Sequence, residues 1–298
     1  MEKHYRGGLY FSGILVGAII AFGVSGASAM SVTLNDGNSS ANIDLDNPAG
    51  QFGWTVDGTT QLFQQWFWYR IGDTGPESTI DTLGLDLHKL VDHGDPGDEK
   101  VLARYGYSHE ATDLAVDVTF TLTGGTTGSG ASDILETIEV FNKSDSGPLS
   151  VDFFEYVDLD LGGTPADLSV EISGGNTAIQ TDFNLLVSET SDVPLPDRWE
   201  VGVYPNTLTK LNDGDADDLD MNAGPILAQN LTWAFQWELV IPAAGDSNDP
   251  DTWQSIIISK DKVINFDTTP GGDPIPVPAA GFAGMALLAI TAARRRNG

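Results

Sequence analysis

The densest acidic run of the chain covers residues 212–220 (NDGDADDLD). Asp213, Asp215 and Asp217 stand at positions 1, 3 and 5 of a calcium-binding loop, where a turn would direct hard oxygen ligands at one cation. Asp218 occupies position 6, where such a loop needs Gly, and the bidentate Glu of position 12 is missing, so the segment is no EF-hand. Two interpretations stay open: a solvated acidic loop, and an irregular Ca²⁺ site. Calcium is the one cofactor that the sequence indicates.

The densest aromatic run covers residues 65–70 (QWFWYR). In a strand, Trp66 and Trp68 share one face, while Phe67 and Tyr69 take the other. Aromatic side chains on both faces favour a central strand that is packed on both sides. The alternative is that Trp66 and Trp68 line a sugar-binding cleft, because aromatic planes suit the apolar faces of pyranose rings.

Motifs for catalysis are missing from the sequence. It has no GxSxG, SxxK, P-loop or GxGxxG pattern, and its His residues show neither HExxH nor HxH spacing. Two carboxylates held about 5–9 Å apart could hydrolyse a glycosidic bond. Glu155, Glu200 and Glu238 lie in or beside predicted strands and are the better candidates for such a pair. The catalytic residues, if there is catalysis, stay unknown at this level.

The composition excludes several classes of protein. The 298 residues carry a formal net charge of −29, which argues against nucleic acid as a partner because phosphate contacts need clustered Lys and Arg. There is no Cys, which excludes disulfides, zinc–thiolate sites and thiol nucleophiles. Hydrophobic residues make up 41% of the chain, enough for a substantial core.

The elements that must position these residues are predicted to be strands. The chain has 32 Asp against 11 Glu, with 34 Gly and 15 Pro, a composition that favours turns over helix interiors. Residues 231–241 alternate most clearly, and Trp233, Phe235 and Trp237 share one face of that strand, with a core more favoured than a ligand cleft. Further strand candidates are 52–56, 62–71, 101–107, 114–122, 134–141, 151–159, 168–172, 178–187, 199–204 and 255–260.

These strands predict an all-β fold, an antiparallel β-sandwich or a larger two-sheet supersandwich, over residues 30–267. The one helix candidate is Ser78–Val91, where apolar residues keep helical spacing and Gly84 weakens the pattern. A loop with a single helical turn is the alternative there.

The first 29 residues have the three parts of a secretory signal peptide. Two basic residues precede an apolar run at 11–24, and Ala27 and Ala29 form an A-x-A site before Met30. The sequence therefore predicts cleavage between Ala29 and Met30.

The opposite end combines a Pro-rich segment, an apolar segment and a basic cluster. Residues 268–278 form a Pro/Gly linker, and residues 279–293 then carry no charge. As a helix, these fifteen residues reach about 22 Å, somewhat less than a bilayer core of roughly 30 Å. Arg294, Arg295 and Arg296 follow and should stay cytoplasmic, which predicts a membrane-anchored precursor with its body outside.

This tail resembles the PEP-CTERM sorting signals of Gram-negative bacteria, in their VPLPA-type variant. The matching motif is Ile275-Pro276-Val277-Pro278-Ala279, followed by the helix and the Arg cluster within residues 279–298. The resemblance implies recognition by an exosortase-like transpeptidase and removal of the tail. It also implies export from an inner-membrane precursor to the cell surface or the exopolysaccharide matrix.

Together these features favour an exported, non-enzymatic structural or binding protein, with extracellular polysaccharide as a partner to consider. The alternatives are a secreted carbohydrate-active enzyme on a β-sandwich and a calcium-stabilised adhesive module. Without the two ends the chain has 9 basic and 42 acidic residues, a net charge of −33, and such a surface repels anionic polymers.

Overall fold

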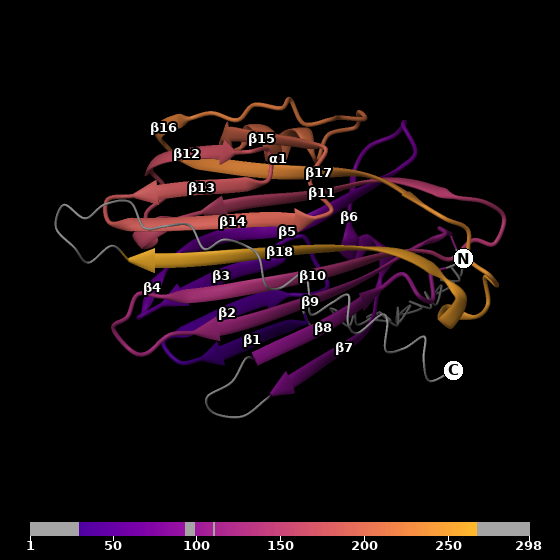
Figure 1. The fold of residues 1–298 in the computed structure, drawn as a ribbon, viewed down its shortest axis with the longest axis horizontal. Coiled ribbons are helices and arrows are strands. Elements are labelled where there is room, and N and C mark those ends of the chain that lie inside the picture. Colours follow the sequence, from indigo (N-terminus) through magenta and orange to yellow (C-terminus); the bar gives the residue numbers. More distant parts are fainter. Residues whose placement is uncertain (1–29, 93–98, 110, 267–298) are drawn as a thin grey trace, which may run out of the picture.

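The computed structural model describes residues 30–92, 99–109 and 111–266 (Figure 1). Within these ranges, eighteen strands form two antiparallel sheets of nine strands each, named sheet A and sheet B here. The sheets pack face to face around a shared apolar core, which confirms the predicted all-β sandwich. The predicted signal peptide, the whole linker with its sorting motif, the C-terminal helix and the Arg cluster lie outside the described residues.

Sheet A places the two aromatic strands near its centre. Its order is β1 (Ser31–Asp36), β2 (Ser39–Asp44), β3 (Gln51–Val56), β5 (Leu62–Ile71), β11 (Leu149–Leu159), β17 (Leu231–Ile241) and β15 (Arg198–Val203). Two short strands extend it: β4 (Thr59–Thr60) pairs with β3, and β6 (Ser78–Thr79) pairs with β5. The predicted limits of β5 and β17 agree with the structure.

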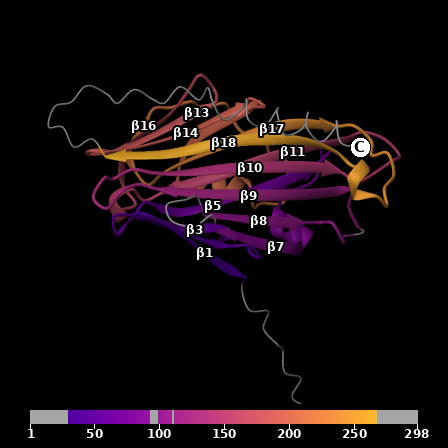
Figure 2. The same cartoon turned by 60° about the horizontal axis from the view of Figure 1, so that its bottom comes forward.

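Sheet B forms the opposite layer, with β18 between β14 and β10 (Figures 1 and 2). Its order is β16 (Ile226–Gln229), β12 (Asp167–Ser173), β13 (Thr177–Asp182), β14 (Leu185–Val193), β18 (Gln254–Phe266), β10 (Ser132–Asn142), β9 (Leu114–Gly124), β8 (Glu99–Tyr105) and β7 (Leu85–Asp92).

Two local predictions were wrong. Residues 78–91 form no α-helix: the single helical turn of the alternative is present, as a 3-10 turn at Ile80–Leu83, but after Gly84, whose φ is 83°, the chain continues as the strand β7 and not as a loop. The predicted strand 178–187 is a hairpin of β13 and β14, because the chain turns at Phe183, which has a φ of 47°.

The core lies between the sheets and is rich in aromatic side chains. Phe67 of β5 stacks on Phe153 of β11, with 5.7 Å between ring centroids, and Trp237 of β17 packs beside Phe153. Trp233, Phe235 and Trp237 are each at most 1% exposed, so the core interpretation of their strand is confirmed.

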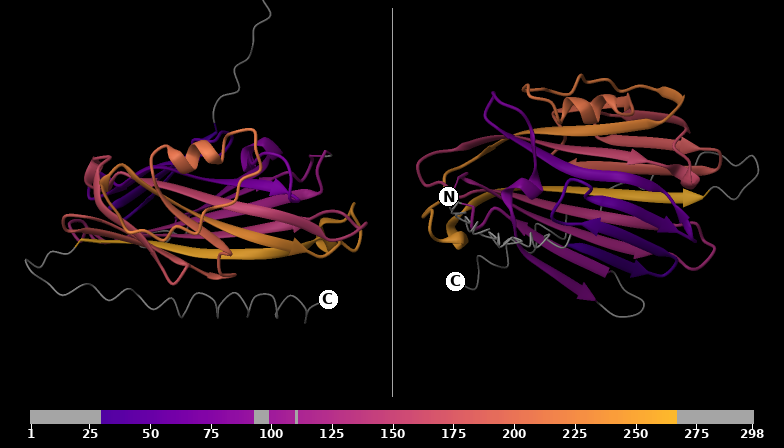
Figure 3. Two further views of the ribbon diagram at one scale, coloured as in Figure 1. Left: turned by 90° about the horizontal axis from the view of Figure 1, so that it is seen from above. Right: turned by 180° about the vertical axis from the view of Figure 1, so that it is seen from behind.

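Sheet A is also covered on its outer face. The short helix α1 (Asn206–Lys210) and the chain that follows it lie over this face, opposite sheet B (Figure 3). The central strands are therefore buried on both sides, as their near-continuous apolar sequence requires. Within the described residues, no helix is long and apolar enough to cross a membrane.

Candidate functional site

The outer face of sheet A carries the polar groups that could do chemistry. On β11 the residues at even positions point to this face, and their cross-strand neighbours on β5 and β17 share it. Asp152 stands at one end of the row and Asp158 at the other, about 20 Å apart at the usual rise of a strand. Phe154 and Tyr156 lie between them, both fully buried.

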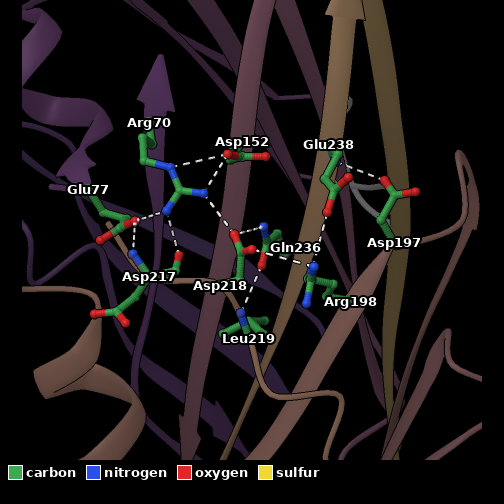
Figure 4. A network of polar contacts seen from close by, with 10 residues as sticks. All are labelled: Arg70, Glu77, Asp152, Asp197, Arg198, Asp217, Asp218, Leu219, Gln236 and Glu238. Carbon is green, nitrogen blue, oxygen red and sulfur yellow. Dashed lines mark hydrogen bonds and ion pairs between the residues drawn. The ribbon is translucent and has the colours of Figure 1, made fainter. Parts of the chain in front are cut away.

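At the first end, Arg70 of β5 is surrounded by carboxylates (Figure 4). Its Nε and Nη2 donate to Asp152 Oδ2 at 3.1 and 2.6 Å, and Nη2 also donates to Asp218 Oδ1 at 2.7 Å. Its Nη1 donates to Glu77 Oε1 at 2.5 Å and to the backbone oxygen of Asp217 at 2.6 Å. All five N–H groups of the guanidinium therefore have protein partners, which leaves none for a ligand. We name this arrangement the Arg70 clamp.

The charges of the clamp hold one another in place. Burial raises the pKa of Glu77 and of Asp152, although the Arg70 cation opposes it at both groups. Burial acts the same way on Asp218, but hydrogen bonds from Arg70 and Gln236 outweigh it and leave the Asp218 pKa below its ordinary value. The clamp thus depends on the Arg70 charge and fixes the acidic loop to the sheet.

The clamp continues across the sheet through the buried Gln236 to a partly exposed ion pair between Arg198 and Glu238. Gln236 donates to Asp218 and accepts from the backbone N–H of Leu219, and Arg198 bonds Glu238 Oε1 at 3.0 Å (Figure 4). Leu219 itself is fully buried and anchors the loop on the sheet.

The acidic loop contains the three aspartates of the calcium prediction. Asp213 Oδ1 accepts from the backbone N–H of Asp215, and the backbone N–H of Asp217 donates to Glu77. No group of three or more His, Asp or Glu side chains in the described part of the chain is arranged to hold a metal ion. The irregular Ca²⁺ site therefore stays a prediction.

The two tryptophans of the cleft alternative are buried. Trp66 is 0% exposed and donates through Nε1 to Asp81 Oδ1, while Trp68 is 1% exposed and its Nε1 donates to Asn212 at 3.3 Å. Trp66 also meets Tyr105 of β8 edge to face, and Trp68 is bonded to the acidic loop, so neither ring offers a free face to a sugar.

The three glutamates considered for hydrolysis are not brought together as a pair. Glu155 points into the core between the sheets, where it contacts Lys260. Glu200 and Glu238 lie on the outer face of sheet A, where Lys210 binds Glu200 at 2.7 Å and Arg198 binds Glu238. Each has an ion-pair partner of its own.

A different carboxylate stands out at the second end of β11. Asp158 is 1% exposed, and its Oδ1 has no hydrogen-bond partner among the described residues. Its Oδ2 accepts a long hydrogen bond of 3.5 Å from the hydroxyl of Tyr156, two residues earlier on the same face. Thr232 stands directly opposite Asp158 on β17, and its buried hydroxyl lies beside the Tyr156 phenol.

Burial changes the protonation of this carboxyl group. Desolvation, with a smaller contribution from the negative charge of Asp160, raises the pKa of Asp158 to about 7. Near neutral pH Asp158 therefore exists both as an acid that can donate a hydrogen bond and as a carboxylate that can accept one.

Two exposed aromatic rings flank this group. Phe63 and Tyr204 meet edge to face with 6.5 Å between ring centroids, and they are 53% and 39% exposed. Tyr204 directly follows β15 and lies near Tyr156. We name Phe63, Tyr156, Asp158, Tyr204 and Thr232 the Asp158 site.

Sequence reasoning missed the Asp158 site. The one available signal was the pair Tyr156 and Asp158 at alternate positions of a strand, which puts a hydroxyl and a carboxyl on one face. That Phe63 and Tyr204 join them follows from the pairing of distant strands.

Comparisons with known proteins add information on the fold alone. No protein-family model matches the chain, and no curated protein matches it. Its fold is similar to part of a bacterial glucoamylase solved with acarbose, at a TM-score of 0.50 and 6% identity, over 81% of this chain and 34% of that one. The chain thus spans about a third of that protein.

Two further solved structures are more distant. A kojibiose phosphorylase homologue from the human microbiome has a TM-score of 0.46 and 10% identity, over 89% of this chain and 32% of that one. An aldose epimerase homologue from C. elegans has a TM-score of 0.38 and 11% identity, over 80% of this chain and 99% of that one.

Proposed function

We propose that this is an exported carbohydrate-binding protein that uses the Asp158 site to hold a neutral oligosaccharide. The observation that carries the proposal is the pair of exposed rings of Phe63 and Tyr204, which meet edge to face on the outer face of sheet A. Exposed aromatic rings pack on the apolar faces of sugars, which makes this pair of rings a binding surface for an oligosaccharide.

The charge of the body and its fold limit the class of glycan that we expect to bind. The net charge of −33 on the body disfavours acidic polysaccharides, so a neutral glycan is the better fit. The sandwich is similar in fold to part of a glucoamylase that was solved with acarbose, which makes glucan oligosaccharides the first ligands to test.

We further propose that the chain reaches the cell surface or the extracellular matrix of a Gram-negative bacterium through its two terminal signals. One contact supports cleavage before Met30: its backbone nitrogen donates to Asp46 Oδ1 at 2.8 Å. Cleavage there would turn this N–H into an ammonium group that already faces a carboxylate.

The test of the binding proposal is calorimetry with maltoheptaose, followed by a panel of other neutral glycans. Phe63→Ala and Tyr204→Ala should each weaken binding at least tenfold, while Phe183→Ala, which removes an aromatic ring that is 85% exposed elsewhere, should not. If no glycan of the panel binds, or if the Phe183 variant weakens binding as much as the others, the proposal is wrong.

A further inference from the structure

Six polar side chains meet in the core between the sheets, on the side of β5 and β11 opposite the Asp158 site. Each is at most 2% exposed. Sheet A supplies two of them and sheet B four: Gln65 and Glu155, then Glu136, Glu189, Lys260 and Lys262.

Lys260 is held as a cation among three glutamates. Its Nζ contacts Glu136, Glu155 and Glu189, and it lies 5.1 Å from the centre of the Phe67 ring. Burial raises the pKa of Glu155 well above its ordinary value, although the charges of Lys260 and Lys262 oppose the shift. At Glu189, burial is outweighed by the charges of Lys260 and Lys262, which lower its pKa to about 2.

The cluster therefore sets three glutamates around two lysines, and the second lysine is Lys262. Its Nζ forms an ion pair with Glu189 Oε2 at 2.8 Å and contacts the amide oxygen of Gln65. Gln65 comes from the other sheet, 197 residues away in the sequence. An amine therefore faces a carboxamide in a site closed to water.

Glu136 touches both nitrogens of this pair. Its Oε1 lies 3.6 Å from Lys262 Nζ, and its two carboxylate oxygens accept from Gln65 Nε2 at 2.6 and 2.7 Å. A carboxylate in this position can take a proton from the amine and deliver a proton to the departing amide nitrogen.

We propose that Lys262 and Gln65 join in an intramolecular isopeptide bond, with Glu136 as the proton-transfer group. The Lys262 ammonium gives a proton to Glu136, and the free amine attacks the side-chain carbonyl carbon of Gln65. The bond between this carbon and the amide nitrogen breaks, that nitrogen takes one proton, and ammonia leaves. The balance is ammonium plus carboxamide plus carboxylate going to secondary amide plus ammonia plus carboxylic acid.

Two physical consequences favour the reaction. It replaces a buried ammonium and a buried carboxylate by neutral groups, and charges without water are costly to keep. It also ties β5 of sheet A covalently to β18 of sheet B, in a chain that has no Cys for a disulfide. Proximity in a rigid core supplies the orientation that such an attack needs.

The test is mass spectrometry of the full chain after denaturation and digestion with trypsin. The bond predicts a mass lower by one ammonia, a linked peptide pair that contains Gln65 and Lys262, and resistance to cleavage after Lys262 but not after Lys260. Separate, unmodified peptides for both residues would overturn the proposal. Loss of one water instead would put the bond on a glutamate and overturn the assignment to Gln65.

Variants connect the bond to its proposed chemistry. Lys262→Arg should abolish the mass loss, Glu136→Gln should slow it at least tenfold in freshly refolded protein, and Lys210→Arg, a change at a surface ion pair, should leave it intact. Near-ultraviolet circular dichroism shows whether each variant folds. If a cluster variant does not fold, the wild-type digest alone still decides the proposal.

Discussion

Arg70 and Asp152 stand directly opposite each other on β5 and β11, and one oxygen of Asp152 accepts from both Nε and Nη2 of the guanidinium. The same guanidinium holds Asp218, which belongs to a loop that follows 148 residues later in the sequence. A single side chain therefore connects the middle of sheet A to the loop that covers it.

Loss of this cation should be costly. Arg70→Met keeps the length of the side chain but leaves buried carboxylates without a counter-charge, and we expect it to lower the free energy of unfolding by about 3–5 kcal/mol. The matched control is Arg198→Met, whose side chain is 35% exposed in its ion pair with Glu238, with an expected cost of about 1 kcal/mol or less. Urea denaturation measures the free energy of unfolding of both variants. Equal losses would contradict the role of Arg70 as the counter-charge of the buried carboxylates.

The aromatic face of β17 should carry much of the core stability. Trp233→Ala and Phe235→Ala each empty a fully buried site and should cost about 3–5 kcal/mol. Val240→Ala, at a position that is 64% exposed on the same strand, should change stability by less than about 0.5 kcal/mol. A near-wild-type denaturation midpoint for both aromatic variants would mean that these rings are not in the core.

Stability should fall with rising pH because of Asp158. Its pKa is about 7 in the folded chain against an ordinary 3.8, so the proton binds the folded state more tightly. The contribution of Asp158 to the free energy of unfolding is fully present below about pH 4, and it is lost as the pH rises through 7. At roughly 1.4 kcal/mol per pKa unit, Asp158→Asn should remove about 4 kcal/mol of this pH dependence. Melting curves from pH 4 to 8 test it, with Asp145→Asn at an exposed position as the control that should keep the wild-type slope.

Mass spectrometry should detect removal of the signal peptide and of the C-terminal tail. Protein recovered from the cell surface should begin at Met30 and lack the segment after about Pro278. Replacement of Arg294, Arg295 and Arg296 by Gln should weaken membrane retention of the precursor, since these are the charges that follow its apolar segment. An intact Arg cluster on the surface-exposed protein would contradict the sorting proposal.

Calcium binding is tested by titration. If Asp213, Asp215 and Asp217 bind Ca²⁺, millimolar Ca²⁺ should give binding heat and raise the melting temperature, and Asp215→Asn should reduce both effects. If Ca²⁺ gives no binding heat and no rise in melting temperature, the prediction of a calcium site is wrong. Asp249→Asn, which removes an acidic group elsewhere on the surface, is the control variant and should leave both effects unchanged.

The sequence by itself determined the class of fold and the strands with a clear apolar period. Residues 62–71 and 231–241 had their limits predicted correctly, because alternation and bounding turn residues are local signals. The helical spacing of apolar residues at 78–91 led to a wrong prediction. Gly84, which has a positive φ, and the pairing of β7 with β8 overrode the local preference for a helix.

The tertiary structure alone decided which face of each strand packs in the core between the sheets and which lies on the outer face of its sheet. Trp68 and Glu155 lie on adjacent strands with equally alternating sequences, yet Trp68 is covered by the acidic loop and Glu155 meets lysines of the other sheet. Lys260 and Lys262 can be buried because glutamates from distant strands surround them, and Asp158 is titratable near neutral pH because strands far apart in sequence bury it. Burial and charge balance depend on contacts between distant segments, and local residue patterns do not contain them.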